Sequence, residues 1–141
     1  RVVSNLTNST KEAFDIASQD YFLDIVDIVK DIYKNIVTQE ESIIIYFQEN
    51  SSIIYQDNEI NRLFLSILIL FQNDILLYYM GNMSHIVFKD QIEIIGSIAR
   101  IKNKNRLIDE LENMLSLQAR MKSYINRSLA YDNLLLSLEK R

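Results

Sequence analysis

The stretch from Gln91 to Met114 constrains the fold most, because the conformation that its residues favour changes from strand to turn and then to helix. Its first half is rich in β-branched isoleucines and contains Gly96, which is typical of a strand. A polar cluster at residues 102–105 predicts a turn. Asn105 then offers a helix cap, and the acidic pair 109–110 lies in or just past the first helical turn. The stretch therefore predicts a strand, a turn and a helix.

The rest of the chain extends this alternation of helices and strands. Apolar residues recur every three or four positions from Phe14 to Ile36, which predicts a helix. Three isoleucines at 43–45 before two aromatic residues favour a strand. Helices are expected over residues 11–37, 59–72 and 105–138, and strands over 42–47, 53–55, 74–80, 84–88 and 91–101. The order α-β-β-α-β-β-β-α predicts an α+β domain with an antiparallel five-stranded sheet and long terminal helices.

Two stretches leave an alternative open, because short apolar runs do not distinguish a strand from a buried helix by period alone. If residues 43–55 and 84–101 are helical, the chain is an all-α helical bundle. That fold would suit a helical sensor domain or an adaptor.

Length and composition limit the classes of function. The 141 residues suffice for one domain with a core, and the net charge of −4 gives no electrostatic case for nucleic-acid binding. The absence of cysteine excludes disulfides and thiolate metal sites, and the single His85 makes no metal centre. The longest apolar run, Leu63–Phe71, is about half of the ~20 residues that a membrane span needs. We expect no catalytic site, no cofactor and no membrane span.

The strand–turn–helix stretch resembles the last strand and last helix of a GAF domain. The motif residues are Asn103-Lys104 after the strand and Asp109-Glu110 soon after it. The resemblance covers about residues 20–126 and implies a GAF/profilin-like fold. Three features depart from the family: Gly96 lies one residue too far from Asn103, the phenylalanine between the two motif pairs is absent, and the segment 56–73 is short. The short segment implies a reduced or absent small-molecule site.

The candidate site residues form three groups. Strand tyrosines are expected to line an aromatic pocket for a small-molecule ligand: Tyr46, Tyr55 and Tyr78. The resemblance to the cyclic-nucleotide-binding members of the family implies a structural ion pair between Lys104 and Asp109. Apolar residues of the last helix are expected to form the seam of a homodimer: Leu111, Met114, Met121 and Ile125.

These features predict a cytoplasmic regulatory domain for signal transduction. Residues 1–141 would form a single GAF-like domain with a polar lead-in at 1–10. Residues 127–141 would project as a coiled-coil linker, carrying a ligand- or partner-induced bias to an output domain in the same protein. Two other classes fit the same order of elements. One is a roadblock or longin-type interaction scaffold, and the other is an extracytoplasmic Cache-type sensor.

Overall fold

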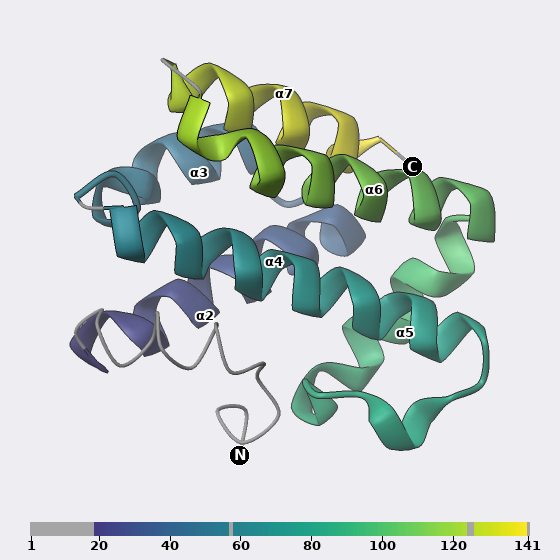
Figure 1. Ribbon diagram of the computed structural model, residues 1–141. Coiled ribbons are helices and arrows are strands. Elements are labelled where there is room, and N and C mark those ends of the chain that lie inside the picture. The colour runs from purple at the N-terminus through teal and green to yellow at the C-terminus, as the bar shows by residue number, and fades with distance from the viewer. Residues whose placement is uncertain (1–18, 57, 124–125, 141) are drawn as a thin grey trace.

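The structure is a computed structural model that describes residues 19–56, 58–123 and 126–140, and within these ranges every regular element is helical (Figure 1). The elements are α2 (Gln19–Thr38), α3 (Ile43–Asn50), α4 (Asn58–Tyr79), α5 (Ile92–Ile101), α6 (Lys104–Arg120) and α7 (Arg127–Glu139). Short 3-10 turns join several of them: Ser51–Ile53, Met83–His85, Lys89–Gln91 and Met121–Ser123.

The helix α4 is the centre of the domain. It packs against α2 and α5 on one side and α6 on the other, while α7 lies on α3 and α6 (Figure 1). Its apolar side chains are buried on one broad face, which includes Leu63, Phe64 and Ile67, and also on the other side of the helix at Leu65 and Leu76. A helix that is apolar nearly all round is stable only inside a core. This accounts for its length, which exceeds the predicted 59–72 at its C-terminal end.

By length and composition alone, α4 would also pass as a membrane span. However, 61% of its most apolar window is buried inside the domain. The core helix of a globular domain has the same signature, so this finding gives little support to a span.

The predicted five-stranded sheet is wrong, and the all-α alternative fits the structure. Residues 43–47 lie in α3, residues 74–79 belong to α4, and residues 92–101 form α5. In α5, burial falls on Ile95, Ile98 and Ala99. That spacing of three and four residues is helical, and it overrides the β-propensity of the isoleucines because burial supplies more free energy than propensity.

A close helix contact, rather than a strand, explains Gly96. A Cβ atom at this position would lie 2.8 Å from the Cζ atom of Tyr78 on α4. Glycine inside a helix costs roughly 0.5–1 kcal/mol relative to alanine. Here it leaves room for the tyrosine ring between α4 and α5.

The last predicted helix, 105–138, is two helices. α6 ends at Arg120, α7 begins at Arg127, and α7 runs back beside α6 (Figure 1). Side chains of α7, including Tyr131 and Leu135, are fully buried. Residues 127–139 therefore fold onto the domain instead of projecting from it as a coiled-coil linker.

The cap of α6 also differs from the prediction. The Asn103 side chain accepts a hydrogen bond from the Arg106 N–H at 2.8 Å, so the cap is Asn103 rather than Asn105.

Candidate functional site

A buried polar network lies where α4, α6 and α7 meet. Glu110 is its centre: its Oε2 atom accepts from Lys102 Nζ at 2.7 Å and from Arg106 Nε at 3.0 Å. Its Oε1 atom accepts from Gln72 Nε2 at 3.1 Å, and Gln72 accepts the Tyr33 hydroxyl at 2.8 Å. These hydrogen bonds join α2, α4 and α6 with the turn between α5 and α6. Such a network fixes the register of the helices, because every member depends on its partners.

Burial dominates the electrostatics of this network. The Lys102 and Glu110 residues are 3% and 4% exposed. Burial lowers the pKa of the Lys102 ammonium, although its ion pair with Glu110 opposes the shift. Burial also raises the pKa of the Tyr33 hydroxyl well above its ordinary value, with a smaller contribution from the Glu110 charge. Tyr33 is therefore a neutral donor to Gln72.

The network holds the end of α7. Lys102 Nζ donates to the Leu138 carbonyl at 2.7 Å, and Arg106 Nη2 donates to the carbonyls of Ser137 and Lys140 at 2.9 and 2.7 Å. Carbonyls at a helix C-terminus lack partners within the helix, and cations there are favourable. Two basic side chains thus satisfy the last turn of α7.

A second contact ties the same turn to α3. The Glu139 carboxylate accepts from the Ile43 N–H at 3.0 Å, at the start of α3. The first N–H groups of a helix lack partners within it, so the carboxylate caps α3. The end of α7 is therefore bonded to α3 through Glu139 and to α6 through Arg106.

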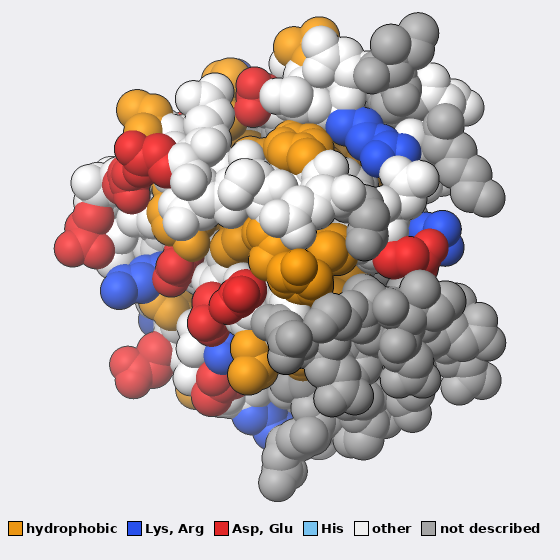
Figure 2. Space-filling view, turned by 90° about the vertical axis from the view of Figure 1, so that its left-hand side faces the viewer, with side chains coloured by type: hydrophobic (Ala, Val, Ile, Leu, Met, Phe, Trp, Pro, Cys, Tyr) orange, Lys and Arg blue, Asp and Glu red, His pale blue; other side chains and the backbone are white. Residues whose placement is uncertain are grey.

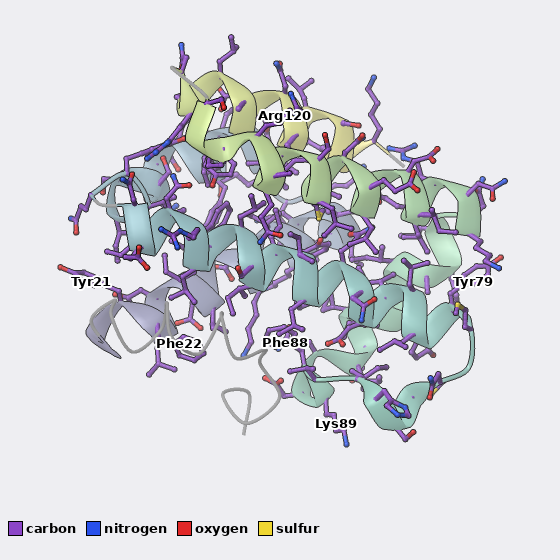
Figure 3. The ribbon with its side chains drawn as sticks, viewed as in Figure 1. Tyr21, Phe22, Tyr79, Phe88, Lys89 and Arg120 are labelled. Atoms are coloured by element: carbon purple, nitrogen blue, oxygen red, sulfur yellow. The ribbon has the colours of Figure 1, made fainter. Side chains whose placement is uncertain are left out.

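A groove of about 480 Å³ lies on the outer side of the α6–α7 hairpin. Its lining comes from both helices and the start of their connection: Asn113, Leu117, Arg120, Ser123, Asn126, Leu129, Ala130, Asn133, Leu134 and Ser137. Arg120 lies at the end of α6 beside α7 (Figure 3). No Asp or Glu is among these described lining residues. The groove combines neutral polar groups, leucines and one cation.

The acidic residues gather elsewhere. Asp24 and Asp27 are exposed on α2, and Asp31 of the same helix accepts a hydrogen bond from the Tyr46 hydroxyl at 2.6 Å. Burial raises the pKa of Tyr46, and its bond to Asp31 and the nearby charges add to the shift. Figure 2 shows acidic side chains around a group of hydrophobic ones on the face where α2 and α4 begin. The groove and the α2 side therefore differ in charge.

Comparison with known protein families decides between the GAF-like interpretation and the all-α alternative. The family model for the C-terminal part of the DNA polymerase III delta subunit matches residues 27–140. The chain belongs to this family. The match runs from α2 to the end of α7 and therefore covers most of the helical domain. No curated protein and no solved structure matches the chain significantly.

Membership of the delta-subunit family overturns the GAF-like interpretation. A family member from the replication machinery is not a sensory signal-transduction domain, and the helical fold has no sheet in its described residues to hold a GAF pocket. The Asn-Lys and Asp-Glu motif residues lie at the start of α6, where Asn103 and Glu110 serve as helix cap and network centre.

The three pocket tyrosines lie apart in this member of the delta-subunit family. Tyr46 binds Asp31 beside α2, and Tyr78 packs against Gly96 of α5. Tyr55 is 37% exposed and lies edge-on to Phe47 at a ring distance of 6.4 Å. None of the three lines the groove.

The remaining predicted residues have different environments. Lys104 and Asp109 are both exposed, and the ion pairs of the described part of α6 join Lys102 and Arg106 to Glu110 instead. Met114 and Met121 are buried in the domain, and Leu111 packs partly against its core. Ile125 lies outside the described residues. The homodimer seam stays a prediction without support from these positions.

Sequence reasoning missed Gln72, Asp74 and Lys102. The sequence predicts a helix that ends at Gln72 and a strand that begins at Asp74, yet both residues are buried within α4. The Asp74 carboxylate accepts from the N–H groups of Val87 and Phe88 at 3.0 and 2.8 Å and holds their loop under α4. Figure 3 shows Phe88 beneath α4 and Lys89 pointing outward. The sequence offered one indication of these residues: Gln72 and Asp74 are polar but stand at positions that face the core if the helix continues.

Metal chemistry finds no support in the described residues. They contain no group of three or more His, Asp or Glu side chains placed to hold a metal ion. His85 is exposed, and its Nδ1 atom lies 2.8 Å from Asn82 Oδ1.

Proposed function

We propose that this chain is a non-catalytic assembly domain, through which a delta-type subunit is built into the clamp loader of a bacterial replicase. The family match over residues 27–140 carries the proposal. The domain acts by binding other subunits of the clamp loader or polymerase, in the cytoplasm where the replication complex works. It is a rigid helical part of a larger machine, and it carries out no reaction of its own.

The structure supports an assembly role in two ways. The tightly packed α4 core and the buried Glu110 network give a stiff body, which an assembly domain needs to hold its neighbours in place. The outer side of the hairpin also exposes leucines, with Leu129 and Leu136 each more than half exposed. Apolar side chains on a surface are favourable in protein–protein contacts.

Assembly with purified subunits tests the proposal. The natural full-length protein that contains this chain is mixed with the other clamp-loader subunits of the same organism. Sedimentation velocity then measures the mass of the complex formed. We expect a stoichiometric complex with those subunits. A full-length protein that sediments alone, or only as its own dimer, at concentrations of about 10 μM would contradict the proposal.

A further inference from the structure

The exposed methionines of the chain are gathered at one place. Of the four methionines, Met80 and Met83 lie where α4 ends and the next turn begins, and they are 59% and 47% exposed. Met114 and Met121 are buried, at 0% and 6%. Tyr79, next to the exposed pair, is 45% exposed and lies at the outer end of α4 (Figure 3). Solvent therefore reaches two thioethers at the end of α4 and is kept from the other two.

A thioether is the side chain that peroxides oxidise most readily here, because the chain has no cysteine. In this reaction a sulfur lone pair attacks one oxygen of the peroxide, the O–O bond breaks, and an S–O bond forms. The sulfur loses two electrons and the peroxide gains them. For hydrogen peroxide, the proton of the transferred oxygen moves to the leaving hydroxide, which departs as water. The product is methionine sulfoxide, a polar side chain that can be reduced back to the thioether.

Backbone hydrogen bonds hold this end of α4 without help from the methionine side chains. Gly81 has a φ of 78°, and its N–H donates to the Tyr78 carbonyl at 3.0 Å. The next N–H, from Asn82, donates to the Leu77 carbonyl at 2.8 Å. This is the left-handed ending of a helix, and it is made by the backbone alone. An oxygen added to either exposed sulfur therefore changes the surface and leaves the helix end in place.

The turn that carries Met83 is fixed from its inner side. The Met83 carbonyl accepts from the Ile86 N–H at 3.2 Å, and the Ile86 side chain is buried. The N–H groups of Val87 and Phe88 donate to the buried Asp74 carboxylate at 3.0 and 2.8 Å. These anchors lie on the side opposite to the exposed methionine, so oxidation there does not touch them.

Oxidation of the buried methionines has the opposite effect. A sulfoxide oxygen at Met114 would lie inside the apolar core, and a buried polar group without a partner is costly. Peroxide reaches such a sulfur only when the domain opens. The exposed pair therefore reacts first, and it reacts in the folded protein.

We propose that Met80 and Met83 form a reversible oxidation site for peroxides. At this site two sulfoxides make the patch of Tyr79, Met80 and Met83 more polar while the domain stays folded. The site is independent of the assembly role, because its reaction needs only the folded protein and a peroxide.

Site-resolved oxidation of the natural full-length protein is the first test. The folded protein is treated with millimolar hydrogen peroxide at neutral pH, samples are quenched with catalase, and tandem mass spectrometry follows the added oxygen at each methionine. We expect Met80 and Met83 to react at least about tenfold faster than Met114 and Met121. Equal rates at all four residues, or protection of the exposed pair, would overturn the proposal.

Reduction of the oxidised protein tests reversibility. Methionine sulfoxide reductases for both sulfoxide epimers are added to the folded, oxidised protein with a dithiol, which becomes a disulfide while the oxygen leaves as water. We expect both sulfoxides to return to thioethers. Sulfoxides that are reduced only after urea has unfolded the protein would show that they are not on the surface, and the proposal would be wrong.

Glutamine variants separate a surface site from a part of the core. Met80→Gln combined with Met83→Gln places neutral polar groups of similar length at the site, and Met114→Gln is the matched buried control. Hydrogen exchange of the full-length variants is compared in α4 and α6. We expect exchange in the double variant within about twofold of the parent, and exchange about tenfold faster in Met114→Gln. Equal acceleration in both variants would mean that the patch supports the fold, which contradicts the proposal.

Discussion

Lys102 Nζ lies 2.7 Å from Glu110 Oε2, and neither side chain is more than 4% exposed. The pair sits at the point where the chain turns from α5 into α6, and Lys102 also donates to the end of α7. Burial of the two charges is tolerated because they pair with each other and because Gln72 and Arg106 donate to the other lone pairs of the Glu110 carboxylate. The pair therefore couples the C-terminal helix to the core of the domain.

Removing one charge of this pair is expected to destabilise the domain strongly. Glu110→Gln leaves the Lys102 ammonium buried with neutral acceptors and no opposite charge, so we expect a loss of about 3 kcal/mol in the free energy of unfolding. Urea unfolding followed by circular dichroism measures it. Glu112→Gln, an exposed position on the same helix, is the control and should change stability by less than about 0.5 kcal/mol.

A double variant distinguishes charge pairing from simple packing. Lys102→Met with Glu110→Leu removes both charges and keeps apolar volume, so it should be less destabilising than Glu110→Gln alone. If the double variant loses at least as much stability as the single one, the buried charge is not the source of the cost.

Arg106 is expected to control how often the end of α7 opens. Arg106→Gln removes the donors to the Ser137 and Lys140 carbonyls, which together contribute about 1–2 kcal/mol to closing that turn. Hydrogen exchange should therefore become about tenfold faster in the last turn of α7. Arg100→Gln on α5 is the control, and equal exchange in both variants would show that Arg106 does not hold the helix.

Asp74 gives a prediction about pH. Burial raises the pKa of its carboxyl in the folded state, although its bonds from the Phe88 and Val87 N–H groups oppose the shift. The folded protein therefore binds more protons than the unfolded chain between the ordinary pKa of about 4 and the raised value. Stability from this group is greatest below pH ~4 and falls as the pH rises through that window.

The comparison with Asp74→Asn isolates this titration, because the amide does not titrate. Urea unfolding of both proteins from pH 3 to 7 gives their stability difference at each pH. We expect the advantage of the parent protein to shrink as pH rises and then to level off. An advantage that grows with pH would mean that the backbone donors outweigh burial and that the folded pKa is lowered.

Helical periodicity predicted α2 and the beginnings of α4 and α6 from the sequence, because apolar residues recur there every three or four positions. It failed for α3 and α5, where neighbouring isoleucines such as Ile94 and Ile95 obscure the period. Lys102, just after α5, also misleads. It lies seven residues beyond Ile95 and is buried on the same face of the helix, but in the sequence a lysine at this position indicates a polar turn.

The candidate site could be predicted only in part for a related reason. Gln72 and Asp74 are polar residues inside a long buried helix, and polar residues in a sequence usually indicate surface or a break. Their burial depends on partners far along the chain, such as Glu110 and Phe88, which a local pattern cannot reveal. Met114 was recognised as part of an apolar seam, but the sequence alone did not distinguish a core from a dimer interface.

The end of α2 offers a stabilising substitution. Gln39 follows the helix with a φ of 56°, and its N–H donates to the Asn35 carbonyl at 2.8 Å, which is the left-handed ending of a helix. A residue with a Cβ atom pays roughly 1–2 kcal/mol for this conformation, whereas glycine adopts it freely but loses more entropy on folding. Gln39→Gly should therefore raise the free energy of unfolding by about 0.5 kcal/mol. Gln48→Gly, an exposed position inside α3, is the matched control and should lower stability by about 1 kcal/mol. Urea unfolding compares the two, and a loss of stability in both would show that Gln39 is not strained.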